Sequence, residues 1–326
     1  MSQRVLITGG TGFVGHHLVP HLIRRGFEVT VGGRQSSAAG LIGAQFISIG
    51  DLRSDIDWNR HLERMDAVVH LAALAHLTSD ISESEYNQVN LLATARLAKA
   101  ASTTGVRLIF VSSVAAQSGS SADRILTEGD VPRPTTPYGR SKLRAELEIK
   151  DVCGDFVILR PTLIYGTNAI GNMQRMIRLA MSPVPAPFGL VANLRSLLAV
   201  ENMCAAIDFV LTSPSATNST FLLSDREPIS TRDLVSQLRS GAGLSTTQIP
   251  VPPVLLRKTL QLLGRGDMWE KLAGNLVTSV AKLEAAGFHW RVNTRDGLYA
   301  LGRVSRSDAN RRSPKESIQA SPLIKK

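Results

Sequence analysis

A serine, a tyrosine and a lysine in the first half of the chain have the types and spacing needed for proton transfer to a substrate oxygen. Tyr138 and Lys142 follow Pro137 directly, so a helix that begins there places both side chains on one face, one turn apart. Ser113 ends the apolar run 108–113. A phenol with a pKa of about 10 is a weak base at neutral pH, and a nearby ammonium favours its ionised form. We therefore expect Tyr138 to act as acid or base, Lys142 to lower its pKa, and Ser113 to hydrogen-bond the reacting oxygen. An exposed tyrosine and lysine on an amphipathic helix are the alternative.

A glycine-rich segment near the N-terminus predicts a dinucleotide site. Gly9, Gly12 and Gly15 follow the apolar run 5–8 and precede a helix expected over residues 13–25. The first glycine would form the tight turn, the second would let main-chain N–H groups approach a pyrophosphate, and the third would permit close helix–strand packing. The phosphates would then lie at the helix N-terminus. A glycine turn without a ligand is the alternative interpretation.

The end of the next expected strand indicates which dinucleotide is bound. Residues 27–31 form that strand, and two glycines and Arg34 follow it, where an NAD site would have a carboxylate for the ribose 2′-OH. A guanidinium suits a 2′-phosphate, so we expect NADP(H), with NAD(H) as the alternative because Arg34 could be a solvated charge. Asp51, after the expected strand 45–49, is either an adenine contact or a helix cap.

Apolar runs alternate with helical segments through the first half of the chain, which predicts the α/β class. We expect a doubly wound parallel Rossmann sheet with a smaller C-terminal substrate-binding lobe. Residues 1–165 would form the dinucleotide-binding domain with the serine, tyrosine and lysine, and residues 166–302 would mainly form the lobe. Residues 303–326 contain seven Lys/Arg and two Asp/Glu, a net charge of +5 out of +10 for the chain. We expect this Ser-rich segment to be a disordered tail.

Composition limits the partners and the compartment. The basic tail has no aromatic residues on which single-stranded bases could stack, so no nucleic-acid partner is expected. Cys153 and Cys204 have neither metal-ligand spacing nor the pattern of a disulfide framework, so we expect no metal and a cytoplasmic location. No apolar run reaches the length of about eighteen residues that a membrane span needs. We therefore expect no integral membrane contact.

In this combination the chain resembles the extended short-chain dehydrogenases/reductases, the NAD-dependent epimerase/dehydratase family, from Met1 to about Leu301. The segments that carry the resemblance are 8–15, 50–52, 70–73, Asn90, 112–113, Tyr138-x-x-x-Lys142, 159–162 and 165–166. It implies that Tyr138 is the acid or base, that Lys142 binds the nicotinamide ribose, and that Ser113 positions the substrate hydroxyl or ketone. The coenzyme contacts that it implies are Gly9, Gly12, Phe13, Val14, Gly15, Arg34, Asp51, Leu52, Leu71, Ala72, Ala73, Asn90, Tyr138, Lys142 and Pro161. It also implies a homodimer formed through the helices that hold Asn90 and Tyr138.

Segments 172–179, 195–203, 230–238, 250–256 and 263–265 of the second half resemble enzymes of bacterial polysaccharide synthesis, which implies a UDP-sugar substrate. The substrate contacts that we expect are His76, Ser113, Tyr138, Asn172, Arg195 and Arg265. Amide and guanidinium donors suit a diphosphate, although Asn172 and Arg195 could also be polar loop residues. The segment 115–119 departs from the family pattern of an aromatic residue followed by glycine, which leaves substrate contacts there in doubt.

Three functions are compatible with these residues. The first is a UDP-N-acetylquinovosamine dehydrogenase, which reduces the C4 ketone of UDP-4-keto-6-deoxy-N-acetylglucosamine in lipopolysaccharide O-antigen synthesis. The second is a UDP-sugar 4-epimerase that acts on UDP-glucose or UDP-N-acetylglucosamine and keeps its NAD tightly bound. The third is a non-catalytic dinucleotide sensor, which the intact Ser113, Tyr138 and Lys142 disfavour. We expect the first.

Overall fold

A seven-stranded parallel sheet is the centre of the computed structural model, which describes residues 2–34, 43–75 and 81–312. Its strand order is β3-β2-β1-β4-β5-β6-β9, and every neighbouring pair is parallel. The strands are β1 (Arg4–Thr8), β2 (Glu28–Gly33), β3 (Gln45–Ser48), β4 (Ala67–His70), β5 (Arg107–Val111), β6 (Phe156–Pro161) and β9 (Ser219–Leu223). The order of the first six is that of a doubly wound dinucleotide-binding sheet, so the expected fold class is confirmed.

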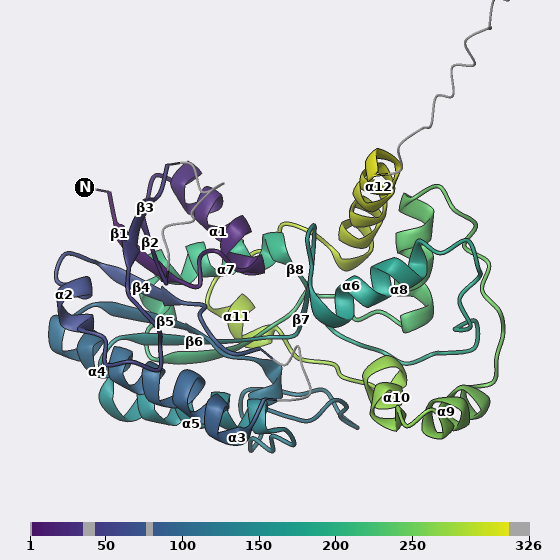
Figure 1. Ribbon diagram of the computed structural model, residues 1–326, viewed down its shortest axis with the longest axis horizontal. Coiled ribbons are helices and arrows are strands. Elements are labelled where there is room, and N and C mark those ends of the chain that lie inside the picture. The colour runs from purple at the N-terminus through teal and green to yellow at the C-terminus, as the bar shows by residue number, and fades with distance from the viewer. Residues whose placement is uncertain (1, 35–42, 76–80, 313–326) are drawn as a thin grey trace, which may run out of the picture.

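Helices cover both faces of the sheet because side chains alternate along each strand (Figure 1). Val5 and Ile7 pack on one face with α1 (Phe13–Arg24), α7 (Val200–Thr212) and α11 (Ala281–Ala285). Leu6, between them in the sequence, packs on the other face. The helices on that second face are α2 (Trp58–Leu62), α4 (Ala93–Thr104) and α5 (Pro137–Val152). Between α2 and α4, the short α3 (Glu83–Tyr86) leads into a π-helical stretch at Asn87–Leu92.

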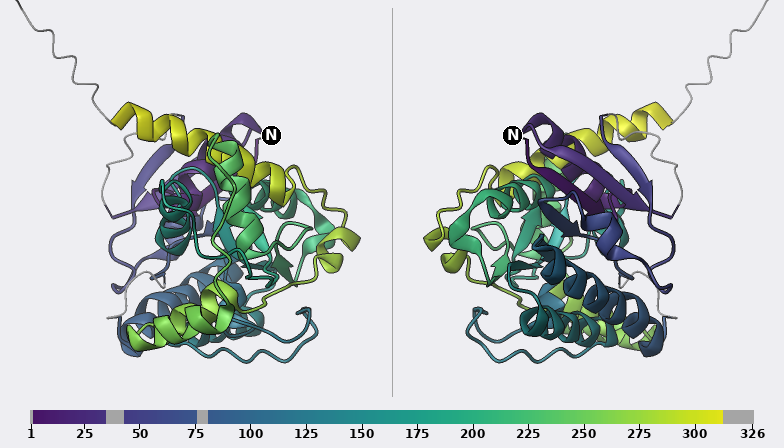
Figure 2. Two further views of the ribbon diagram at one scale, coloured as in Figure 1. Left: turned by 90° about the vertical axis from the view of Figure 1, so that its right-hand side faces the viewer. Right: turned by 90° about the vertical axis from the view of Figure 1, so that its left-hand side faces the viewer.

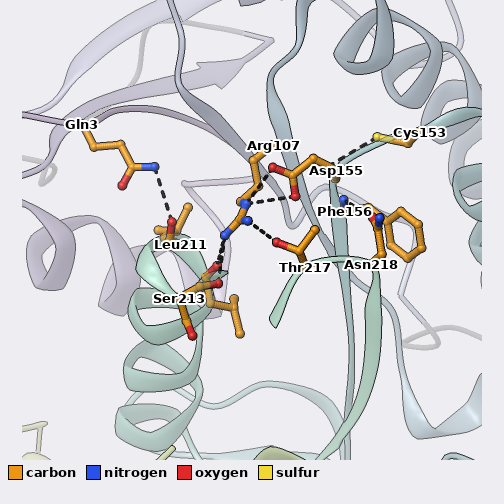
Figure 3. Close-up of polar contacts among 10 residues, drawn as sticks. Gln3, Arg107, Cys153, Asp155, Phe156, Leu211, Ser213, Thr217 and Asn218 are labelled. Atoms are coloured by element: carbon orange, nitrogen blue, oxygen red, sulfur yellow. Dashed lines mark hydrogen bonds and ion pairs between the residues drawn. The ribbon is translucent and has the colours of Figure 1, made fainter. Parts of the chain in front are cut away.

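Arg107 closes the amino edge of the sheet (Figure 3). Its Nε donates to both carboxylate oxygens of Asp155 at 3.1 and 3.0 Å, and its Nη1 donates to the carbonyl oxygens of Val210 and Ser213 at 3.1 and 3.2 Å. One guanidinium thus joins the starts of β5 and β6 to the end of α7. The candidate site lies at the opposite, carboxyl edge of the sheet.

The smaller lobe has its own apolar core and lies to one side of the sheet (Figure 1). Its elements are β7 (Leu163–Tyr165), β8 (Leu197–Ala199), α6 (Gly171–Ala180), α8 (Thr231–Gly241), α9 (Pro253–Leu262), α10 (Gly266–Ala273) and α12 (Thr294–Arg312). The strands β7 and β8 form a parallel pair. The expected boundary near residue 166 is where the chain first leaves the sheet, but α7, β9 and α11 return to it. The sheet domain is therefore formed by residues from both sides of position 166, and the two parts are not continuous in sequence.

The C-terminal helix corrects the expectation of a disordered tail from residue 303. The helix α12 continues to Arg312, and Figure 2 shows it as one unbroken rod along the smaller lobe. Leu298 and Leu301 are buried in the core of the lobe. A Cβ on Gly302 would overlap the carbonyl oxygen of Leu238, so the absence of a side chain there allows the main chains of α12 and α8 to lie in contact. The helix continues past these packed residues into the basic segment as far as residue 312, and residues 313–326 lie outside the described part.

In the described ranges, no helix combines the length and the apolar character that a bilayer crossing requires. The two cysteines are buried and not disulfide-bonded.

Candidate active site

A cavity of about 380 Å³ opens at the carboxyl ends of β1, β2 and β4. This is where an open parallel sheet binds its ligands. The residues that line it are Gly9, Thr11, Gly12, Gly32, Gly33, Arg34, Ile49–Arg53, Leu71–Leu74 and Val89. Eight of the expected coenzyme contacts are therefore brought together from the four segments that follow β1, β2, β3 and β4.

The glycines of the first connection leave room that side chains would fill. Gly9 has φ +72°, and a Cβ there would lie 2.7 Å from the main-chain nitrogen of Ala72, on the connection after β4. A Cβ on Gly15 would overlap the main chain of Gly10, so α1 can approach the strand only without one. The helix begins at Phe13 and presents its N-terminus to the turn. The donors and the space fit a pyrophosphate.

Two arginine side chains line the cavity beyond the end of β2. Arg34 follows Gly33 at the end of β2, and both line the cavity. Arg53 lines it as well, with its Nε 3.9 Å from Asp51 Oδ1. Sequence reasoning did not find Arg53, and its position two residues after Asp51 was the available signal. Two guanidiniums at this end suit a phosphate more than a neutral ribose.

Asn90 is a connecting residue between the coenzyme cavity and the helix of the tyrosine. It is buried in the π-helical stretch, where its Oδ1 accepts from the Leu74 main-chain N–H at 2.8 Å. Its Nδ2 donates to the Leu74 carbonyl and to Ser141 Oγ, both at 3.1 Å. Ser141 in turn donates to the Tyr138 carbonyl at 2.8 Å. Of the remaining expected coenzyme contacts, Phe13, Val14 and Gly15 lie in the first turn of α1 and Pro161 ends β6, outside the cavity lining.

The expected catalytic residues converge at the carboxyl end of β5. Ser113 lies just beyond this strand and caps a short 3-10 helix at Val114–Ala116, and Tyr138 is in the first turn of α5. A Cβ on Gly139 would overlap the carbonyl oxygen of Ala115, so this glycine allows α5 to pack directly on the serine turn. The sequence analysis gave Gly139 no role, although its place beside the tyrosine was visible. The contact brings Ser113 within hydrogen-bonding distance of Tyr138.

Burial, and not Lys142, has the largest effect on the pKa of Tyr138. Desolvation raises the pKa of Tyr138 to about 12, partly offset by the hydrogen bond with Ser113. The expected lowering of this pKa by Lys142 is therefore not what the structure shows. The ammonium of Lys142 instead donates to the Val111 carbonyl at 2.7 Å and lies 4.3 Å from the centre of the Phe110 ring. Burial lowers the pKa of Lys142 to about 7, against the opposing effect of Glu146.

A buried ion pair between Glu146 and Arg160 lies next to the residues that hold Ser113, Tyr138 and Lys142 in place. Glu146, one turn after Lys142 on α5, accepts from Arg160 Nε at 2.9 and 3.1 Å. Ser112 Oγ also donates to Glu146, and Arg160 donates to Gln117. The adjacent serines therefore have different partners, since Ser112 binds the buried carboxylate and Ser113 binds the tyrosine. The network ties α5 to the ends of β5 and β6.

His70 is held in the sheet, away from proton chemistry. Its Nδ1 lies 2.7 Å from Thr8 Oγ1 and its Nε2 lies 3.2 Å from Thr94 Oγ1. Burial, with a smaller contribution from Lys142, lowers the pKa of His70 to about 3. A neutral imidazole between two hydroxyls joins β1, β4 and α4.

A second cavity, of about 240 Å³, lies in the smaller lobe and contains the expected diphosphate contacts. Asn172 is at the start of α6, and Arg195 precedes β8. Arg195 Nη1 donates to the carbonyls of Ser120, Glu270 and Gly274 at 3.2, 3.3 and 2.8 Å, which fixes the guanidinium. Burial lowers the pKa of Arg195 to about 10. The residues that line the cavity are Ser120, Leu163, Asn172, Met173, Arg175, Met176, Leu179, Phe188, Arg195, Leu197, Thr231, Leu234, Met268, Lys271 and Leu272.

Two cations that sequence reasoning missed complete this cavity, and one expected cation is outside it. Arg175 and Lys271 line the cavity with Arg195, and no acidic residue is among the lining residues described. Arg265 is exposed at the start of α10 and does not line it. Helical spacing gave a signal for Arg175, three residues after Asn172. His76 lies outside the described residues.

Comparisons with known proteins agree with this geometry. Residues 5–223 match the family described as NAD dependent epimerase/dehydratase. A UDP-glucose 4-epimerase of Vibrio cholerae is 33% identical over 292 residues, which cover 86% of this chain and 88% of that protein. Among solved structures, MoeE5 in complex with UDP-glucuronic acid and NAD has a TM-score of 0.72 at 26% identity, covering 94% of this chain and 99% of that one. A UDP-glucose 4-epimerase of Thermotoga maritima, solved with UDP-glucose, shares the fold with a TM-score of 0.75 at 21% identity, covering 94% and 100%.

Proposed function

The chain belongs to the NAD dependent epimerase/dehydratase family, and from that premise we propose that it is an NAD(P)-dependent oxidoreductase acting at C4 of a UDP-sugar. The proposed reaction is reduction of the C4 ketone of UDP-4-keto-6-deoxy-N-acetylglucosamine, which gives UDP-N-acetylquinovosamine. The observation that carries the proposal is the convergence of Ser113 and Tyr138 at the carboxyl end of β5, beside the coenzyme cavity.

The described side chains fit the two protein roles in such a reduction. A nicotinamide coenzyme, when bound, would supply the hydride that adds to C4 of the sugar. Tyr138 is a neutral phenol at neutral pH because its pKa is about 12, so it can give its proton to the oxygen that forms at C4. Ser113 donates a hydrogen bond to the same oxygen and orients it. Lys142, one turn after Tyr138 on α5 and held by the Val111 carbonyl, would bind the ribose of the coenzyme.

The cavity of the smaller lobe supports a nucleoside diphosphate as the carrier of the sugar. Arg175, Arg195 and Lys271 place three cationic side chains around it, and Asn172 adds an amide donor. Guanidinium groups bind phosphates through paired N–H donors, and none of the described lining residues is a carboxylate that would repel the anion. Arg195 is already held by three carbonyls, so little side-chain freedom is lost when it binds.

The residues at the end of β2 support a proposal for the coenzyme. Gly33 occupies the position where a carboxylate would hold the ribose 2′-OH of NAD, and Arg34 lines the cavity directly after it. Arg53 adds a second guanidinium. We propose a preference for NADP(H) over NAD(H) on these contacts. A preference for NADP(H) favours the reductase over an epimerase of the kind that retains NAD. A reductase exchanges its coenzyme in each turnover.

A UDP-sugar 4-epimerase is the second candidate, and the Vibrio cholerae relative favours it. The same serine and tyrosine serve an epimerase, which transfers hydride from C4 and returns it to the other face of the ketone. An epimerase of this kind regenerates its coenzyme in every cycle and retains NAD. The two candidates therefore differ in net consumption of coenzyme.

The decisive experiment supplies UDP-4-keto-6-deoxy-N-acetylglucosamine in place, with a dehydratase, and follows the absorbance of NADPH and separately of NADH. Stoichiometric consumption with a 6-deoxy UDP-sugar product supports the reductase. Tyr138→Phe should lower that rate by about 10²- to 10⁴-fold because it removes the proton donor. Conversion of UDP-glucose or UDP-N-acetylglucosamine to the 4-epimer without coenzyme consumption would replace the reductase by the epimerase. Wild-type turnover by Tyr138→Phe would refute both.

We also propose that the protein is a cytoplasmic homodimer formed through α4 and α5. Leu92, directly before α4, and Leu147 on α5 are 48% and 56% exposed, which offers an apolar surface for a four-helix contact. Light scattering of the purified protein tests this, with Leu147→Glu as the variant expected to give monomers.

A further inference from the structure

The helix α9 has an exposed apolar surface at the edge of the smaller lobe. Val254, Leu255, Leu262 and Leu263 are 63%, 54%, 88% and 66% exposed, and we call these four residues the α9 patch. Elsewhere in the described chain, no ten consecutive residues expose more than two large apolar side chains. Such a concentration on a protein surface indicates an interaction site, because single exposed apolar residues are common and clusters are not.

Most of the large apolar side chains of α9 and its end face away from the protein, and few of them face the core. Leu256 faces inward and packs against the core of the smaller lobe, which fixes the orientation of the helix. Val254, Lys258 and Leu262 are spaced four residues apart, so they share the outer face, and Leu255 lies beside Leu262 at a spacing of seven. The exposed Lys258 therefore lies between Val254 and Leu262 on the face that carries the α9 patch.

The charged residues of α9 and of the sequence that flanks it have a single sign. From residue 234 to residue 266 the sequence contains no Asp or Glu, whereas it contains Arg239, Arg257, Lys258 and Arg265. The last three are exposed. Cations that border an apolar helix face are typical of helices that lie in the headgroup region of an anionic bilayer. A protein partner that covered the patch would have to supply its own acidic ring.

A second copy of this chain fits the patch poorly. A two-fold contact places the same surface of both copies together, so Arg257, Lys258 and Arg265 of each would meet their counterparts. Like charges at an interface oppose association. Figure 1 also places α9 at the far end of the molecule from α4 and α5, where the proposed dimer contact lies. The patch would remain accessible in that dimer.

We propose that the α9 patch docks the protein onto the surface of an anionic phospholipid bilayer. Leu255, Leu262 and their neighbours would enter the interface between headgroups and acyl chains, and the cations would contact the lipid phosphates. The α10 helix packs against α9 and contributes Met268, Lys271 and Leu272 to the cavity of the smaller lobe. Docking would therefore hold that cavity next to the membrane surface.

The test is flotation of the full-length protein with vesicles of phosphatidylcholine, with and without phosphatidylglycerol. We expect at least about tenfold stronger binding to the anionic vesicles at low salt, and loss of that preference at high salt. The double variant Leu255→Glu/Leu262→Glu should reduce binding by about tenfold or more, because it places carboxylates in the apolar face. Val131→Glu is the matched control, since Val131 is 72% exposed on the sheet domain, and it should bind as the wild type does.

Several results would overturn the proposal. These are absence of wild-type binding, equal binding to both vesicle types, and undiminished binding of the double variant. Loss of binding by Val131→Glu would also overturn it, because the effect would then not belong to α9. Light scattering that shows the double variant breaking an oligomer would assign the patch to a second copy instead. Turnover with soluble substrate should equal that of the wild type in the double variant, which shows that it is folded.

Discussion

The buried ammonium of Lys142 should make the stability of the coenzyme-free protein depend on pH in a specific way. Burial lowers the pKa of Lys142 from 10.5 to about 7, so the folded protein releases this proton well before the unfolded chain does. Between pH 7 and 10.5 the unfolded chain binds more protons, and linkage then requires that the free energy of unfolding increase with pH. Below pH 7 the ammonium is charged in both states, and the full cost of burying it remains.

The size of the effect follows from the two pKa values. Each pKa unit corresponds to about 1.4 kcal/mol, and integration between pH 7 and pH 9 gives an increase of about 2 kcal/mol from this single group. Lys142→Met keeps the length of the side chain and removes the proton. The free energy of unfolding of the wild type, minus that of Lys142→Met, should therefore rise by about 2 kcal/mol from pH 7 to pH 9. Other titrating groups are common to both proteins and cancel in this difference.

The assay is urea unfolding at both pH values, followed by circular dichroism, with Lys282→Met as the matched control. Lys282 makes the same two kinds of contact at the surface, because its Nζ donates to the Thr220 carbonyl at 3.0 Å and lies 5.2 Å from the centre of the Phe221 ring. Water solvates this ammonium in the folded protein, so the difference between Lys282→Met and the wild type should be the same at both pH values. A difference for Lys142→Met that stays constant, or falls, from pH 7 to pH 9 would refute the reasoning.

Two further substitutions test how the site is built. Gly139→Ala should lower kcat by about 10²-fold, because its Cβ would displace the turn of Tyr138 from the turn of Ser113. A Cβ on Gly154 meets nothing within 4 Å, so the control variant Gly154→Ala should have the wild-type kcat. Equal kcat values for the two variants would contradict the close packing at Gly139. Glu146→Ala should cost about 3–5 kcal/mol in urea unfolding by leaving buried Arg160 unpaired. Asp66→Ala breaks a largely exposed pair and should cost at most about 1 kcal/mol, so similar losses in the two variants would show that burial does not matter.

The sequence predicted those parts of the site that depend on local spacing. The turn of Gly9 and Gly12 follows from a strand, a helix and the backbone freedom of glycine, all within fifteen residues. Tyr138 and Lys142 share a face because of the period of the helix that begins at Pro137. The parallel sheet followed from the alternation of apolar runs with helical segments. These features need no knowledge of what lies far away in the chain.

The tertiary structure decided which distant residues meet. The cations Arg175 and Lys271 reach one cavity from different helices, while Arg265, six residues before Lys271, does not. Burial determines the ionisation of Tyr138 and Lys142, and the depth of a side chain is set by everything that packs around it. The order of the strands, the crossing of α8 and α12, and the exposed face of α9 are likewise results of packing. A local pattern fixes the direction of a side chain on its own element, but only the assembled layers determine what that side chain faces.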